Sequence, residues 1–561
     1  MFQPKSDAVS LGYDSMLIPC RNGLDFGENS QVVWDIPRNI GMAQLKDARV
    51  LVDVNINGSE TAGVFQLDRI AGGNSLFERI TIRSSGRVIE QLDSYNIYAK
   101  LHYSATDDDG VMNKRSVLEG CAPSYRVNDN PFYSVAQAEG EAAVGSSETF
   151  GTYVDRRLEI PLLGGIFTNP KAFPLMAVPL EVECILATGS HILHVADGGE
   201  ELACDNTIGA QNWLELTWAA AAMLGQAGNT DPLQTVTNLD DVAVACQLSQ
   251  TANLPFRIGQ QIRFEATGGA GTAAASGQLQ QVTWIGAGPG NGKVRLIFGA
   301  DVGDGALTGI TIHTLDATGG LLAGQTVNYQ FKNPRLIIPK VVPDPKYRQR
   351  MVKALLSGQY QIPLISYIDY NNAIVGSQTS STNIIPADLS RVKSILSVPI
   401  KQQNQNKYNN HNALSGQYMD ASEYEYQINN ILRPDRRVDL TREAFGGSVD
   451  GAEWTKTKAV PSWSLGNCPS GFHLFETEKA LRTAGINVRN LQFLTKGPKQ
   501  DGYWLVGRTL GPYGTSENLM GISSILYLNY SGGDQALKLL HNYVVHIRTL
   551  GLSMNGVEVR Y

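Results

Sequence analysis

The sequence has few cysteines and no long apolar run. Its six cysteines are scattered over 561 residues without a CxxC pair: Cys20, Cys121, Cys184, Cys204, Cys246 and Cys468. This spacing predicts neither a disulfide framework nor a zinc cluster, so we expect buried or incidental thiols. No stretch approaches the ~20 consecutive apolar residues of a membrane-spanning helix, and the first residues lack the apolar segment of a secretory signal. We therefore expect the chain to stay in the compartment where it is made.

An excess of positive charge is also missing. The formal net charge is −7, from 46 basic and 53 acidic residues, and neither sign dominates a block of sequence. A protein that neutralises many nucleic-acid phosphates is usually strongly basic. We therefore expect no specific nucleic-acid site, and any such contact to be weak or local.

Gly286–Lys293 (GAGPGNGK) is the segment that most resembles a phosphate-binding loop, and it fails the test. The P-loop pattern needs Gly where Ala287 stands and Ser or Thr where Val294 stands. A dinucleotide-binding GxGxxG pattern fails as well, because Asn291 occupies the place of the third Gly. The segment therefore predicts a turn between two strands.

Residues that could bind a metal or act as an acid or base form no recognisable pattern. The closest histidines are His191 and His194, without a Cys or carboxylate at helpful spacing, so we expect surface histidines. Asp107–Asp109 lacks the alternating ligands of a calcium loop and predicts a solvated turn. Glu423 and Glu425 are expected to share one strand face and point to solvent. We therefore nominate no catalytic, cofactor-binding or metal-binding residue, expect no cofactor, and expect the chain not to be an enzyme.

One short segment concentrates positive charge. Leu432–Leu440 (LRPDRRVDL) holds Arg433, Arg436 and Arg437. These arginines could contact a neighbouring subunit or nucleic acid. A solvated strand end, with the arginines paired to Asp435 and Asp439, is the interpretation that we favour.

The chain does contain many patterns typical of β-strands. Arg49–Ile56 alternates Val50, Val52, Val54 and Ile56 with more polar positions. Further strands are predicted in the first third at Gln31–Ile36, which ends at Pro37, and at Leu76–Ile82, Arg157–Leu162 and Val178–Leu186. Asp93–His102 predicts a short helix with Asp93 as its N-cap. The 57 glycines, many of them between short apolar runs, favour an all-β fold.

The composition shifts after about residue 190. Residues 191–327 are rich in Ala, Gly, Thr and Gln, yet they keep strand-like runs at Ile262–Ala266, Gln281–Ile285 and Lys293–Phe298. A flexible linker would lack the Trp, Phe and Ile that these runs can bury. We therefore predict a small inserted β-domain.

A helix is predicted directly after this insertion. Asp344 and Pro345 suit the N-cap and first turn, and Gly358 suits the end. Tyr347, Met351 and Leu355 form one apolar stripe at i, i+4 and i+8. A second strand-rich block follows, with predicted strands at Val392–Ile400, Tyr424–Ile428, Tyr503–Val506, Ile522–Leu528, Tyr543–Leu550 and Gly556–Tyr561. The polar run Lys401–Ala413 predicts a surface loop.

Four segments, taken in their order along the chain, resemble one family. Leu67–Ile82 (LDRIAGGNSLFERITI), followed by Val88–Gln91 and Tyr95-Asn96, resembles the first-barrel signature of double jelly-roll major capsid proteins. The resemblance is to the Polinton-like virus, adintovirus and virophage type, related to the adenovirus hexon. Further similar stretches are Gln31–Pro37, Ala172–Leu186 and Tyr329–Leu356. The insertion at 191–327 departs from compact members of the family.

The resemblance implies two tandem eight-stranded jelly rolls. Together with the insertion and the helices predicted from the residues, the expected fold is all-β, with an inserted small β-domain and few short helices. Residues 1–190, completed by 328–343, would form the first jelly roll. Residues 191–327 would form an outer tower, and 344–561 the bridging helix and second jelly roll. It also implies a homotrimeric capsomer of pseudo-hexagonal outline in the icosahedral shell of a DNA virus. Implied partners are other copies of the chain and neighbouring capsomers, penton and minor capsid proteins, and a host-surface receptor at the outer loops.

Two other functions remain open at this point. A carbohydrate-binding or fibre-type attachment protein would present an aromatic platform, which Trp454 and Trp463 could supply, although we expect them in the core. A β-rich hydrolase would need a constellation of Asp, Glu or His that the sequence does not offer.

Overall fold

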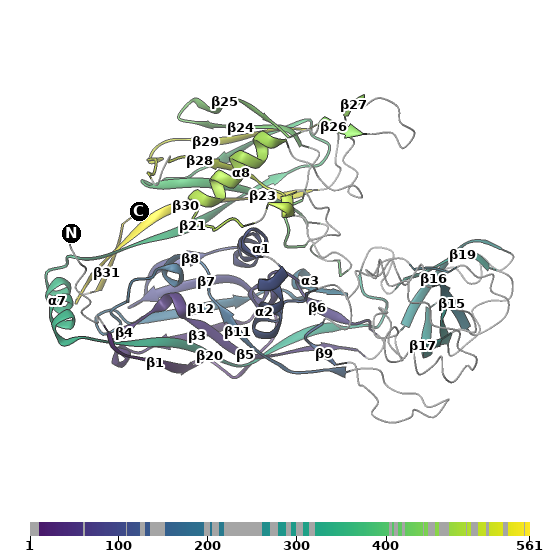
Figure 1. Ribbon diagram of the computed structural model, residues 1–561, viewed down its shortest axis with the longest axis horizontal. Helices are drawn as coiled ribbons and strands as arrows, with labels where there is room; N and C mark the ends of the chain where they lie inside the picture. Colours follow the sequence, from purple (N-terminus) through teal and green to yellow (C-terminus); the bar gives the residue numbers. More distant parts are fainter. Residues whose placement is uncertain are drawn as a thin grey trace.

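A computed structural model describes most of the two strand-rich blocks and parts of the insertion. The described residues are 10–59, 62–107, 109–123, 130–134, 152–195, 320–402, 405, 407–408, 413–417, 421–440, 443–446, 455–458, 470–489, 491–494, 503–511, 515–530, 537–554 and 556–560, together with short strands between 202 and 313. Both β-blocks are visible in Figure 1, one above the other, with the strands of the insertion at one end.

The first block consists of two main antiparallel sheets. One joins β1 (Ser10–Pro19), β20 (Val327–Pro343), β5 (Arg49–Gly58) and β11 (Arg156–Pro161) in that spatial order. The other joins β3 (Gln31–Ile36), β12 (Leu180–Leu186), β7 (Phe77–Ser84) and β8 (Arg87–Leu92). Short strands β2 (Asp25–Phe26) and β4 (Met42–Ala43) add to β20.

The second block repeats this construction. One sheet joins β21 (Tyr360–Ile374), β30 (Lys538–Ser553), β23 (Val392–Lys401) and β28 (Val506–Thr509), and β31 (Gly556–Arg560) adds to β30. The other joins β22 (Ser380–Ile385), β29 (Ser524–Tyr530), β24 (Ala421–Ile428) and β25 (Ile431–Asp439).

The two blocks have the same strand order. When the eight main strands of each block are numbered along the chain, both blocks have one sheet of order 1-8-3-6 and one of order 2-7-4-5. This order, with first and last strands adjacent, is that of an eight-stranded jelly roll. The predicted fold class, two tandem jelly rolls with an inserted β-domain, is confirmed.

Alternation of side chains explains how the strands form the core. On β5, Val50, Val52, Val54 and Ile56 are at most 1% exposed, while the residues between them are half-buried. Successive side chains of a strand point to opposite faces, so these four side chains fill the space between the two sheets.

Helices interrupt the same connection in both jelly rolls. Between its fifth and sixth strands, the first roll carries α1 (Tyr95–Thr106) and α2 (Asp109–Glu119), and the second carries α8 (Gly471–Thr483). The helix predicted at Asp93–His102 is confirmed as α1, but its N-cap is Ser94. Asp93 instead accepts a hydrogen bond from Gln91.

The predicted bridging helix is also confirmed, but Tyr347, predicted to lie on its apolar stripe, is 36% exposed, and only Met351 and Leu355 of the stripe are buried. The helix is α7 (Pro345–Leu356), and the carboxylate of Asp344 accepts a hydrogen bond from the backbone N–H of Lys346 at 2.9 Å. Gly358 follows with a φ of +67°, in the left-handed region that glycine tolerates. Figure 1 shows α7 at the end of the molecule where it links the two rolls.

The insertion contains a separate antiparallel sheet between the seventh and eighth strands of the first roll. Its order is β14 (Leu202–Cys204), β19 (Leu307–His313), β16 (Gln261–Gly269), β17 (Leu279–Ala287), β18 (Lys293–Phe298) and β15 (Trp213–Thr217). The three strands predicted here correspond to β16, β17 and β18. Smaller pairs elsewhere are β6 (Phe65–Leu67) with β13 (Leu193–Val195), β9 (Tyr133–Ser134) with β10 (Thr152–Tyr153), and β26 (Glu443–Gly446) with β27 (Thr455–Lys458).

Two predictions for the second block need correction. The strand predicted at Tyr503–Val506 is β28, which begins only at Val506, because Tyr503 and Trp504 point into the core before pairing starts. The run Lys401–Ala413 is not wholly a surface loop. Tyr408 packs edge-on against Phe65 with ring centroids 5.5 Å apart, and Ala413 is fully buried. Residues 403–404, 406 and 409–412 lie outside the described residues.

Candidate functional site: the seam between the two jelly rolls

The two jelly rolls meet through a cluster of buried tyrosines, which we call the seam. Tyr98 of α1 stacks on Tyr367 of β21, with ring centroids 4.2 Å apart and planes inclined by 30°. Tyr543 of β30 packs edge-on against both rings, at 5.5 Å from Tyr98 and 5.2 Å from Tyr367. All three side chains are 6% exposed or less. Aromatic pairs in these geometries stabilise beyond their buried area, by about 0.5–1.5 kcal/mol each.

Tyrosine hydroxyls of the second roll bond the backbone of α1 and its cap. Tyr543 donates to the carbonyl of Ser94 and Tyr503 donates to the carbonyl of Ile97, both at 3.2 Å. Burial raises the pKa of Tyr503 and Tyr543 well above the usual value, so both hydroxyls keep their protons and remain donors. These bonds give the seam a defined geometry, because each hydroxyl meets one acceptor.

A buried carboxylate also crosses the seam. Glu90 of β8 is 0% exposed. One of its oxygens accepts from the hydroxyl of Ser366 on β21, and the other accepts from the backbone N–H of Ile166 at 3.0 Å. Gly165 has a φ of +49°, and a Cβ there would stand 1.8 Å from the Glu90 carboxylate, so only glycine fits. The carboxylate therefore joins three segments that are distant in sequence.

Further hydrogen bonds extend the seam along its length. Arg548 of β30, 3% exposed, donates to the carbonyl of Ile89 at 2.6 Å. Tyr360 donates to the carbonyl of Ala172 at 3.1 Å. The backbone N–H of Arg489 donates to the carbonyl of Ala105 at 2.9 Å. One continuous apolar core includes the interior of the first roll and the seam residues of the second, so the two rolls are packed as a single body.

The first roll holds a buried ion pair beside this core. Lys100 of α1 and Asp68 are each 1% exposed, and their Nζ and Oδ2 atoms are 2.5 Å apart. The other oxygen of Asp68 accepts from the backbone N–H groups of Ile70 and Ala71. His194 Nε2 lies 3.9 Å from Asp68 Oδ2. The prediction of a surface histidine is therefore wrong for His194, which is fully buried on β13; His191 is half-buried on α3 (Gly189–Ile192).

Asp107, which was predicted to lie in a solvated turn, has a structural role. Asp107 pairs with Arg115, whose side chain is 6% exposed, and Arg115 also pairs with Glu119 at 2.9 Å. The guanidinium lies 3.3 Å from the centre of the Tyr103 ring. The prediction is wrong for Asp107 because α2 begins at Asp109 and brings Arg115 back over it. Asp108 lies outside the described residues.

The remaining candidate charges pair on the surface of the second roll. Glu423 and Glu425 share one face of β24, as predicted, and both lie 3.4 Å from the Arg437 guanidinium. Glu425 is only 6% exposed, so its predicted solvent orientation is wrong. Arg433 pairs with Glu517 at 2.6 Å. We predicted that these arginines pair with Asp435 and Asp439. Arg433 and Arg437 instead form ion pairs with glutamates of other segments.

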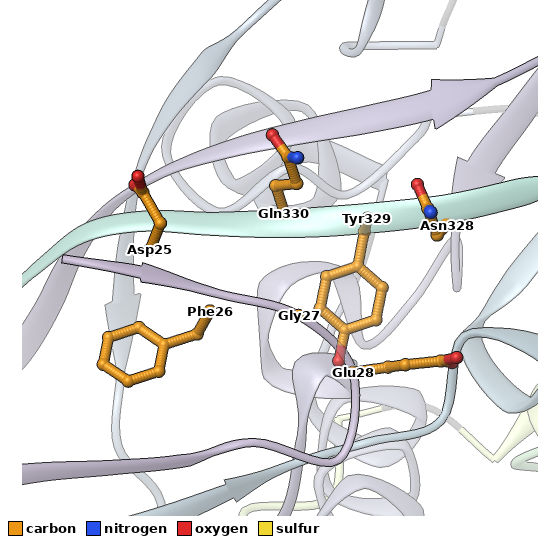
Figure 2. Close-up of a pocket in the computed structure, with 7 residues that line it drawn as sticks. All are labelled: Asp25, Phe26, Gly27, Glu28, Asn328, Tyr329 and Gln330. Carbon is orange, nitrogen blue, oxygen red and sulfur yellow. The ribbon is translucent and has the colours of Figure 1, made fainter. Parts of the chain in front are cut away.

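A shallow hollow of about 370 Å³ lies beside β2 and β20, lined by residues 25–28 and 328–330 (Figure 2). Its carboxylate Glu28 accepts a hydrogen bond from the backbone N–H of Gly189 at 2.6 Å. Tyr329 donates to the carbonyl of Ala187. The lining contains no His, Cys, Ser or Thr, and its Glu28 and Tyr329 side chains are both engaged in these structural hydrogen bonds.

Metal sites, membrane-spanning helices, free thiols and the glycine-rich segment are the remaining candidate features. Within the described residues, no group of three His, Cys, Asp or Glu side chains could hold a metal ion. In the same part of the chain, no helix is long and apolar enough to cross a membrane. Cys121 and Cys184 are free and buried, as expected for structural thiols. Gly286–Lys293 connects β17 to β18, which pair antiparallel with Ala287 opposite Val294. Residues 288–292 of this connection lie outside the described residues. The same is true of Trp454 and Trp463, the candidates for an aromatic platform.

Sequence reasoning missed the seam, although part of its signal was present. The segment Tyr95–Tyr103 contains three tyrosines on one short helix, an unusual content for a surface helix. Their partners, Tyr367 and Tyr543, are several hundred residues away in the sequence, and no local pattern connects them.

No family model and no curated protein matches the sequence. Solved structures that are similar include the Faustovirus major capsid protein (11% identity, TM-score 0.49, covering 99% of this chain and 92% of that one). A second is the PBCV-1 virus capsid, with 10% identity and a TM-score of 0.44, covering 100% of this chain and 99% of that one. A third is the mavirus major capsid protein, with 10% identity and a TM-score of 0.37, covering 100% of this chain and 94% of that one. We transfer no residue role from them. Over its whole length, the chain is similar to viral capsid proteins.

Proposed function

We propose that this chain is a major capsid protein that forms pseudo-hexameric homotrimeric capsomers and tiles an icosahedral viral shell. The observation that carries the proposal is the repeat of one eight-stranded order in two jelly rolls that a buried seam holds side by side. The protein would lie in the virion, and in the host cell interior before assembly.

The repeated roll suits a lattice with six neighbours. Three chains with two similar rolls each present six similar units around a three-fold axis, which approximates a hexagon. Such a trimer needs heterologous contacts, in which one roll meets the other roll of the next copy. The outline stays hexagonal only if the rolls within a chain do not rotate. The tyrosine cluster and the Glu90–Ser366 bond oppose that rotation.

We further propose the domain division stated above: 1–190 completed by 328–343, an insertion at 191–327, and 344–561. The pairing of β20 with β1 and β5 supports the assignment of 328–343 to the first roll. The pairing of β13 with β6 suggests that the first roll extends a few residues beyond 190. The sheet β14–β19 would be an outer tower, a surface for a host receptor, and the sides of the rolls would contact neighbouring capsomers, penton and minor capsid proteins.

Negative-stain microscopy of the purified chain tests this function. We expect particles with three-fold symmetry and a nearly hexagonal outline, and larger curved arrays at high concentration. The double variant Tyr98→Ala/Tyr367→Ala removes the stacked rings of the seam, lowers the stability of the molecule as well, and should blur or distort that outline in particles that remain folded. Elongated single copies in every condition, together with binding to a glycan array, would instead favour an attachment protein.

A further inference from the structure

The bridging helix α7 carries an unusual concentration of positive charge. Pro345–Leu356 (PKYRQRMVKALL) contains Lys346, Arg348, Arg350 and Lys353 and no acidic residue. The whole chain, by contrast, has a net charge of −7. All four basic side chains are exposed. The helix therefore presents a local cationic surface on an acidic protein.

Helical spacing places three of these charges in one row. Lys346, Arg350 and Lys353 stand at i, i+4 and i+7, so they lie on the same face of α7. The apolar row of the helix, Met351 and Leu355, is 3% exposed or less and packs on the protein's own core. We call the row of Lys346, Arg350 and Lys353 the basic stripe; it faces away from the core.

No carboxylate among the described residues neutralises the basic stripe. Within the described part of the chain, no carboxylate forms an ion pair with Lys346, Arg350 or Lys353. The nearest acidic residue in sequence, Asp344, is engaged as the N-cap. Some exposed basic side chains elsewhere do have acidic partners, as Arg21 has Asp35 and Glu181.

The stripe also lies at a defined end of the molecule. In Figure 1, α7 is at one end of the long axis and the strands of the insertion, β15–β19, are at the other. If the insertion forms the outer tower, α7 points to the inside of the shell. Binding of a partner to the basic stripe does not depend on that placement, which decides only whether the binding would take place inside the shell.

We propose that the basic stripe of α7 is a docking surface for the phosphate backbone of nucleic acid. Seven residues of helix rise about 10.5 Å, and duplex DNA carries one negative charge per ~1.7 Å of its axis, so several phosphates lie within reach of the three side chains. Contacts of this kind release counterions and read no sequence. The binding is therefore non-specific and falls steeply with salt.

An anionic bilayer is a less suitable partner for this helix. A helix that lies in a membrane interface inserts a continuous apolar face between lipids. That face of α7 is already used against the core, because Met351 and Leu355 are buried. The two exposed apolar side chains of α7, Tyr347 at 36% and Leu356 at 69%, are nine residues apart and lie on opposite sides of the helix, so they form no continuous apolar face. The charge pattern fits a polyanion better than a lipid layer.

Fluorescence anisotropy with a labelled 30-base-pair duplex tests the proposal on the full chain. We expect binding at 50 mM salt that weakens steeply by 200 mM salt. The variant K346Q/R350Q/K353Q should bind at least about tenfold more weakly at 50 mM salt, with a salt slope smaller by about three. The charge-keeping variant K346R/K353R should bind like the original chain.

A matched control removes three exposed charges elsewhere. The variant K479Q/R482Q/R489Q changes the net charge equally, on and after α8 of the second roll, and should leave DNA binding unchanged. Equal loss in both triple variants, no loss in the α7 variant, or no binding by the original chain would each overturn the proposal. So would α7-dependent binding to vesicles of phosphatidylserine without binding to DNA. Circular dichroism melting shows whether each variant is folded. Failure of this test leaves trimer formation, which is measured separately, unaffected.

Discussion

Tyr98 of the first jelly roll stacks on Tyr367 of the second, with ring centroids 4.2 Å apart and ring planes inclined by 30°. The contact joins the two jelly rolls, and both rings are nearly inaccessible to solvent. The stack therefore helps to hold the two rolls together as one body.

The first prediction concerns this stack. Replacing Tyr367, 1% exposed, by Ala should lower the free energy of unfolding by about 3–5 kcal/mol, because the change leaves a cavity in the seam. Limited proteolysis should also begin to separate the two rolls. The matched control is Phe475→Ala on α8, whose side chain is 57% exposed and which should cost less than about 0.5 kcal/mol. Equal melting temperatures for the two variants would contradict a seam that stabilises the molecule.

The second prediction concerns Gly165. Gly165→Ala combines a left-handed φ of +49° with a Cβ 1.8 Å from the Glu90 carboxylate, so Glu90 must leave its place opposite Ser366. Gly86→Ala has a φ of +80° but open space around the added Cβ, so it costs only backbone strain of about 1 kcal/mol. Thermal melting should show a clearly larger loss for Gly165→Ala. A loss no larger than that of Gly86→Ala would mean that Glu90 does not hold the seam together.

The third prediction compares a buried and an exposed ion pair. Lys100→Met leaves Asp68 charged and 1% exposed, and should lower the free energy of unfolding by about 3–5 kcal/mol. Arg21→Met breaks the pairs with Asp35 and Glu181, but the Arg21 side chain is 52% exposed, so solvent screens these pairs and the loss should be much smaller than for Lys100→Met. Urea unfolding measures both values. Similar values for both variants would contradict the burial of the Lys100–Asp68 pair.

The fourth prediction concerns stability in acid. Burial lowers the pKa of His473 from 6.5 to about 3, beside Tyr424 and Trp504. Between these two pKa values the unfolded chain binds a proton that the folded chain does not. This histidine therefore contributes its full stability above pH 6.5 and loses about 1.4 kcal/mol per pH unit as the pH falls toward 3.

The variant His473→Phe keeps an aromatic ring but cannot take up a proton. Its melting temperature should fall less between pH 6.5 and pH 4 than that of the original chain. His102 and His546, whose pKa values burial also lowers to about 4, should still cause some loss in both proteins. Parallel pH curves for the two proteins would show that His473 is not buried in its neutral form.

Strands with local alternation could be predicted from the sequence, and their limits followed the pattern closely. The strand Gln31–Ile36 has the predicted ends, because Pro37 follows it. The helix α8 was missed because its buried face includes His473, Glu476 and Thr477, which hide the apolar period that would reveal it. The strand β21 was missed although Ile362 and Leu364 alternate with exposed positions; Pro363 between them argued against a central strand.

The buried charges and the seam could not be predicted, because they depend on distant segments. Nothing local indicates that Asp68 meets Lys100, or that Glu90 meets Ser366, which lies 276 residues further along the chain. His194 seemed to be a surface histidine because its neighbours in sequence include no partner. Its burial comes from the pairing of β13 with β6. Local pattern therefore predicted the strands, while the contacts that orient the two rolls came only from the fold.

The central claim is that two rolls locked in one chain form a three-fold building block. Light scattering coupled to size-exclusion chromatography measures the mass of that block directly. With 60.9 kDa per chain, three copies give about 183 kDa. We expect this mass for the purified protein over a range of concentrations at neutral pH. A mass of one chain at every concentration would contradict the account.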